Sequence, residues 1–111
     1  MTLVNLTPHA VTLVVGDHQV VFQPSGDVAR VSQINHLMGT IEVEGLQVPV
    51  GAPQFGELTG LPDPQDGIMF FVSRLVLQAA RAQGRTDCVC PLDTVRDEAG
   101  RIVGLTALAT E

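Results

Sequence analysis

The apolar residues of this chain fall into short runs, and glycine or proline interrupts the chain before any run becomes long. Runs of about four to eight β-branched or aromatic residues between turn residues predict β-strands. The 11 glycines and seven prolines are spread along all 111 residues. This pattern favours many short elements joined by turns. The length is typical of one domain, so we expect a single domain over residues 1–111.

Three hairpins are predicted, because turn residues separate pairs of short apolar runs. The predicted pairs are 11–15 with 20–22, 40–43 with 46–50, and 94–96 with 102–109. Four further short runs also predict strands, namely 3–6 at a sheet edge, 28–31, 68–72 as a buried central strand, and 88–90. By contrast, residues 51–67 are interrupted by several prolines and glycines. We therefore expect a long irregular surface loop there.

One segment has helical rather than strand periodicity. Leu75, Val76, Ala79 and Ala80 recur on one helical face after Ser73, which can cap the helix. A glycine follows at position 84, so the predicted helix spans about 74–83. Together these elements predict an α+β domain, made mainly of antiparallel β hairpins packed on one helix.

The charge balance excludes some partners. The net charge is −6, which disfavours binding to nucleic acids and to anionic membranes. The chain has no lysine, so its six fixed positive charges are all arginines. Biased codon usage is the simpler explanation, but arginines can also frame a small anionic ligand through bidentate hydrogen bonds. The N-terminus lacks a basic segment followed by a long apolar run. We therefore expect no signal peptide and a cytoplasmic location.

The strongest candidate for a binding site is the junction between the predicted strand 68–72 and the helix. A helix N-terminus offers free N–H groups and a positive dipole end, and Arg74 lies in the first turn. With Arg30 or Arg96 nearby, this junction could hold an anion.

Catalytic and metal sites are less well supported. Cys88 and Cys90 lie on one face of a strand and could begin a metal site with a histidine, but no second ligand pair exists. The favoured interpretation is that the two cysteines act as small buried hydrophobic residues. We therefore expect no metal and no cofactor. Ser73, or His9 with Asp97, could serve a small hydrolase. This is the weakest hypothesis, and we expect a protein that is not an enzyme.

Several motifs together resemble a known family. They are Asn5-Leu6-Thr7-Pro8-His9, Pro24-Ser25-Gly26 with Ala29-Arg30-Val31, Gly60-Leu61-Pro62, Val72-Ser73, and a stretch from Asp87 through Arg96-Asp97-Glu98-Ala99-Gly100-Arg101-Ile102-Val103-Gly104. Such motifs are typical of a family of small proteins from bacteriophages and from bacterial, especially actinobacterial, genomes. The resemblance covers most of the chain and implies a phage or prophage context, but no particular chemistry. The two cysteines lie outside its pattern.

Two functions follow as expectations from these observations. The first is a non-catalytic accessory protein that binds a small anionic ligand such as a nucleotide and so sequesters a host signal. Its candidate ligand-binding residues are Thr7, His9, Arg30, Ser73, Arg74 and Arg96. The alternative is a protein–protein interaction module that inhibits or recruits a host protein. In either case we expect a homo-oligomer, because small β domains expose strand edges that pair across symmetry axes.

Overall fold

Eight β-strands and one short helix form the protein. The computed structural model covers residues 1–111. No helix in it is both long enough and apolar enough to cross a membrane. The elements in chain order are β1 (Thr2–Asn5), β2 (Val11–Val15), β3 (His18–Phe22), β4 (Arg30–Val43), β5 (Leu46–Thr59), β6 (Ile68–Phe71), α1 (Arg74–Ala82), β7 (Cys88–Arg96) and β8 (Ile102–Ala109).

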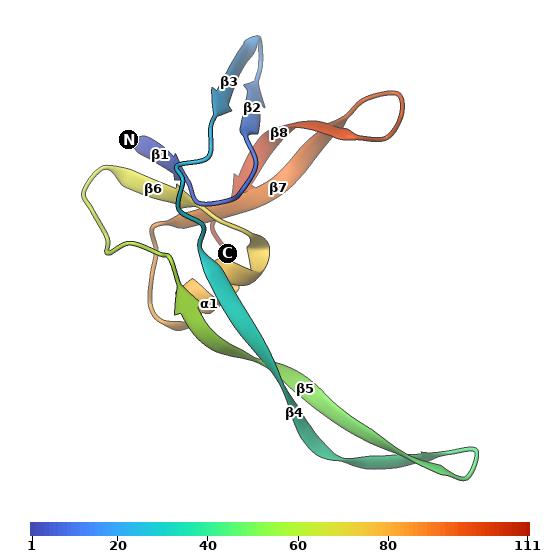
Figure 1. Ribbon diagram of the computed structural model, residues 1–111. Helices are drawn as coiled ribbons and strands as arrows, with labels where there is room; N and C mark the ends of the chain where they lie inside the picture. Colours follow the sequence, from blue (N-terminus) through green and yellow to red (C-terminus); the bar gives the residue numbers. More distant parts are fainter.

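Six strands form one sheet, in the order β1-β6-β7-β8-β2-β3. Its pairs β1–β6, β6–β7 and β2–β8 are parallel, whereas β7–β8 and β2–β3 are antiparallel. The two end strands return towards each other, because Asn5 at the end of β1 forms a bridge with Pro24, just after β3. The sheet is therefore nearly closed on itself, and these strands form the body of the molecule (Figure 1).

The other two strands form an arm. β4 and β5 have 14 residues each and pair only with each other. Their hairpin leaves the body and ends at the turn of Glu44 and Gly45 (Figure 1). Both turn residues have positive φ, as a tight two-residue hairpin turn requires. The arm gives the molecule its longest dimension, 58 Å.

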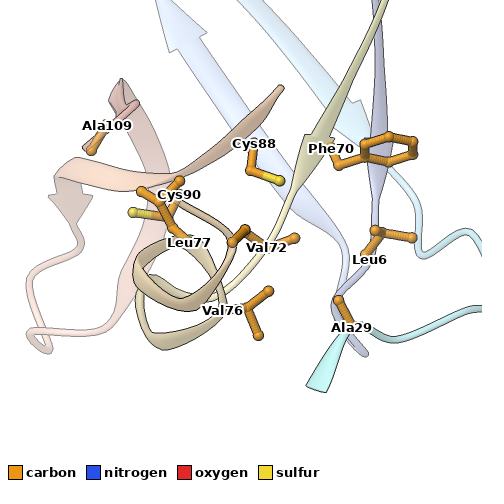
Figure 2. Close-up of a cluster of buried hydrophobic side chains, with 10 residues drawn as sticks. Leu6, Ala29, Phe70, Val72, Val76, Leu77, Cys88, Cys90 and Ala109 are labelled. Atoms are coloured by element: carbon orange, nitrogen blue, oxygen red, sulfur yellow. The ribbon is translucent and has the colours of Figure 1, made fainter. Parts of the chain in front are cut away.

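The main core lies between the sheet and α1. Strand residues alternate across the sheet, so Cys88 and Cys90 face the helix while Val89 points to the other side. Figure 2 shows Cys88, Cys90 and Val72 within one cluster, in which Leu77 of the helix lies near Cys90 and Phe70 lies on the side of Cys88. On the other face only three residues are fully buried, namely Phe71, Val89 and Leu105.

The predicted fold class is wrong. The chain is mostly β with a nearly closed sheet, and its only helix has nine residues, so this is no α+β fold of hairpins packed on a helix. All three predicted hairpins do occur, as β2–β3, as the distal end of β4–β5 and as β7–β8. Parallel pairs, however, join the first and the third of them with β1 and β6 into one sheet. Parallel pairing links segments far apart in sequence, such as β1 and β6, and no local pattern indicates it.

The predicted loop 51–67 is also largely wrong, because β5 continues to Thr59. In the same way, residues 28–31 and 40–43 are not two strands: β4 runs unbroken from Arg30 to Val43. A two-stranded arm leaves one edge of each strand unpaired, and such an edge tolerates proline. The helix is confirmed over Arg74–Ala82, and its cap is Ser73 as predicted.

Candidate functional site

Three segments that carry the sequence motifs meet at the base of the arm. The N–H of Ser25 donates to the carbonyl of Asn5 at 2.9 Å, and the N–H of Ala29 donates to the carbonyl of Leu6 at 3.0 Å. The N–H of Leu6 in turn donates to the carbonyl of Phe71 at 2.9 Å. The chain segments around residues 5–9, 24–30 and 71–76 are therefore held side by side by main-chain hydrogen bonds.

A cleft of about 290 Å³ opens where these segments meet. It brings together Arg30 at the start of β4 and Ser73 at the start of α1, two of the predicted ligand-binding residues. Pro8 also borders it, so the loop that carries Thr7 and His9 lies at its edge. The lining residues are Pro8, Val28, Ala29, Arg30, Val31, Ser73, Leu75 and Val76. The walls are thus mainly apolar, with one cation and one helix N-terminus at the rim.

Arg30 differs from every other arginine of the chain, because its guanidinium has no hydrogen-bond or ion-pair partner within the protein. Each of the other five donates to a carboxylate or a carbonyl; these are Arg74, Arg81, Arg85, Arg96 and Arg101. Arg30 is exposed, and it lines a second hollow together with Glu57 but forms no ion pair with that residue. All five donors of the Arg30 guanidinium are therefore free for an external acceptor.

The N-terminus of α1 adds a second positive feature to the cleft. Ser73 has extended backbone geometry, and its Oγ accepts a hydrogen bond from the N–H of Val76 at 3.3 Å. The N–H groups of Arg74 and Leu75 have no partner within the helix, since they belong to its first turn. They lie at the positive end of the helix dipole. The hydroxyl of Ser73 is engaged as a cap, and no histidine or acid hydrogen bonds to it.

Thr7 and His9 lie on the loop beside the cleft, and a residue outside the predicted set fixes this loop. The side chain of Asn5 is 2% exposed. Its Nδ2 donates to the carbonyl of His9 at 2.8 Å, and its Oδ1 accepts from the N–H and the hydroxyl of Thr7, at 2.9 and 2.6 Å. Thr7 therefore has a structural role, while the imidazole of His9 is exposed. The signal that could have identified Asn5 is a lone asparagine at the end of an otherwise apolar run.

The two remaining arginines of the predicted site point elsewhere. Arg74 follows Ser73, but its Nη2 donates to the carbonyl of Pro91 on β7 at 3.2 Å. Arg96 donates to the carbonyl of Gly100 at 2.8 Å, within the β7–β8 hairpin. In Figure 1 this hairpin extends from the body on the side away from the arm. The structure thus brings Arg30 and Ser73 together and leaves Arg96 out of the cleft.

The other candidate groups have structural roles. Cys88 and Cys90 are buried in the main core, as predicted for small hydrophobic residues. Burial raises the pKa of both thiols, that of Cys88 to about 11, so both are protonated near neutral pH. No cluster of three or more histidine, cysteine or acidic side chains is placed to hold a metal ion. Asp97 accepts hydrogen bonds from Ala99 and Arg101 within its own turn.

Comparison with protein-family models, with curated proteins and with solved structures gives no match for this chain.

Proposed function

We propose that this protein is a small phage- or prophage-associated accessory protein that binds an anionic ligand, such as a nucleotide, without transforming it. The observation that carries the proposal is the unpartnered guanidinium of Arg30 on the rim of an apolar cleft. A free arginine is a strong donor for phosphate, because its planar fork forms two parallel hydrogen bonds with the anion.

The cleft offers different contacts to two parts of such a ligand. Arg30 and the N–H groups at the start of α1 hold the anionic part, which also gains from the helix dipole. Pro8, Val28 and Leu75 offer an apolar wall to a base or a sugar face. Nothing in the cleft is placed to activate a nucleophile, so the bound molecule is retained unchanged. Retention of this kind would sequester a signal in the host cytoplasm, where the free thiols of Cys88 and Cys90 also persist.

The test is a binding assay with linear and cyclic nucleotides, in which the matching nucleosides serve as uncharged controls. We expect at least one nucleotide to raise the melting temperature and its nucleoside to have no effect. Arg30→Gln should weaken binding by about tenfold or more, since a charge-assisted hydrogen bond contributes roughly 1.5–3 kcal/mol. Arg101→Gln removes the same charge from an exposed hairpin and should leave the affinity unchanged. Native mass spectrometry of protein purified gently from host cells would then identify the retained species.

The proposal fails if no nucleotide binds, or if the two arginine variants lose affinity equally. Equal losses would mean that the effect is one of net charge rather than of the cleft.

An interaction module that inhibits or recruits a host protein is the second candidate. It is favoured by the arm, where Leu37 and Met38 are each 66% exposed. Monomeric proteins rarely leave many large apolar side chains uncovered in one region. Recovery of one specific protein from host lysate, lost when Leu37 and Met38 are both replaced by serine, would support it.

A further inference from the structure

The base of the arm has a polar face whose direction is fixed by the core. There β4 and β5 pair Arg30 with Thr59 and Val31 with Leu58. Val31 and Leu58 are half-buried and pack against the main core. Partners in an antiparallel pair share a face, and successive pairs alternate between the two faces. Arg30 and Thr59 therefore lie on the face that points away from the core.

A bulge adds two residues to this polar face. The register of β4 and β5 shifts just after Val31, so that Ser32 alone opposes both Gly56 and Glu57. The Oγ of Ser32 accepts a hydrogen bond from the N–H of Glu57 at 2.9 Å, which ties the bulge across the two strands. A side chain at position 56 would collide with the hydroxyl of Ser32, so the bulge requires a glycine there. Bulges of this kind redirect a side chain locally and are frequent beside functional sites.

The polar face encloses a hollow of about 360 Å³, which we call the arm-base hollow. Its lining residues are Arg30, Val31, Ser32, Glu57 and Thr59. Arg30 and Val31 also line the cleft described above, so the hollow and the cleft adjoin at the start of β4. Glu57 is the only acidic residue that lines either of them, and its carboxylate forms no ion pair. An unpaired cation and an unpaired anion thus share one hollow.

These charges determine which part of a nucleotide each space can receive. A carboxylate only accepts hydrogen bonds, so the group beside Glu57 must be a donor. It also repels phosphate, which therefore stays on the cleft side, at Arg30 and the start of α1. The hydroxyls of the sugar are uncharged donors adjacent to the phosphate. In dinucleotide-binding domains, likewise, an acidic side chain accepts the hydrogen bond of the ribose 2′-hydroxyl.

We propose that the arm-base hollow is the sugar subsite of the ligand and that Glu57 determines its specificity. The Glu57 carboxylate accepts a hydrogen bond from the ribose 2′-hydroxyl, while Arg30 holds the adjacent phosphate. Ser32 and Thr59 line the same hollow and offer hydroxyls to the rest of the sugar. The protein therefore selects ribonucleotides over 2′-deoxyribonucleotides. This inference rests on the nucleotide-binding function proposed above.

The test is titration calorimetry with pairs of nucleotides that differ only at the 2′ position. The probes are the ribonucleoside 5′-monophosphates and 3′,5′-cyclic monophosphates of the common bases, each paired with its 2′-deoxy form. For each pair that binds, we expect the wild type to favour the ribonucleotide by about fivefold or more, since the 2′-deoxy form loses one charge-assisted hydrogen bond. Glu57→Gln should reduce this preference to about twofold or less, because a neutral amide is a weaker acceptor.

Glu42→Gln is the matched control. It removes the same charge from an exposed position of the distal arm, where Glu42 pairs with Gln47. It should keep the preference of the wild type. The measured quantity is a ratio of two affinities, so a change in net charge affects both forms equally and cancels. Both glutamates are exposed, and circular dichroism should show both variants folded.

Two results would overturn the inference alone. One is equal affinity of the wild type for the two forms, and the other is a ribonucleotide preference that persists in Glu57→Gln. In both cases nucleotides still bind, and a loss of affinity in Arg30→Gln would still support the proposed function. If no nucleotide binds the wild type, the proposed function fails and the sugar subsite fails with it.

Discussion

Replacing Asn5 by alanine should weaken the whole body of the protein, because its side chain adds hydrogen bonds to the main-chain bridge between the two ends of the sheet. Asn5 closes β1, and its Nδ2 donates to the carbonyl of Phe22 at the end of β3, at 3.1 Å. The same amide also holds the loop of Thr7 and His9. An alanine would remove this partner from the carbonyl of Phe22, from the N–H of Thr7 and from the carbonyl of His9, which would keep only the hydroxyl of Thr7 at 3.2 Å.

The size of the effect follows from the number of bonds lost. Each hydrogen bond contributes about 1 kcal/mol net, and a partner left unsatisfied in a buried place costs about 1–3 kcal/mol. Three main-chain groups lose a partner, so we expect a loss of about 3–4 kcal/mol in the free energy of unfolding. For a domain of this size, that corresponds to a fall of roughly 12–16 °C in melting temperature.

Urea denaturation followed by circular dichroism measures this loss directly. Asn35→Ala is the matched control, because Asn35 is exposed in the arm and its side chain forms no hydrogen bond. It should change stability by less than about 0.5 kcal/mol. Hydrogen exchange should quicken in β1 and β3 of the Asn5 variant before it does in β7. A loss below about 1 kcal/mol at position 5, or an equal loss at position 35, would refute the role of Asn5 as the joint of the sheet.

Two further predictions concern ionisable groups. Burial raises the pKa of the Cys88 thiol to about 11 and also raises the pKa of the Cys90 thiol. Both thiols should therefore resist a disulfide reagent at pH 8 until denaturant is added. Rapid labelling of the native protein would contradict their burial. Hydrogen bonds from Arg85 hold the pKa of Asp87 in the folded protein below its ordinary value of 3.8. The pair therefore stabilises the fold fully at a pH above 3.8. This contribution is lost as the pH falls through the pKa that Asp87 has in the folded protein. Asp87→Asn should therefore flatten the acid limb of the stability curve relative to Asp93→Asn, and identical acid limbs would count against the pair.

Local features of the fold were predictable from the sequence, because the residues that determine them are neighbours in the chain. The helix begins after Ser73 and ends before Gly84 for reasons of capping and backbone freedom that involve about three turns of chain. The turn at Glu44 and Gly45 is equally local. So is the anion-binding potential of a helix N-terminus, which makes Ser73 a candidate from its position in the sequence alone.

The tertiary structure alone decided the sheet and the cleft. β1 pairs in parallel with β6, which lies more than sixty residues further along the chain. The sequence of neither strand indicates which strand it pairs with. Pro53 indicated a loop, yet it pairs with Asn35 within the arm, because a ribbon of two strands leaves each proline an unpaired edge. Arg30 and Arg96 were equal candidates in sequence, and only folding left one unpartnered at the cleft and bound the other to its own hairpin. The physical reason is that capping and turns depend on adjacent residues, whereas pairing, burial and the fate of each charge depend on segments that only the folded chain brings together.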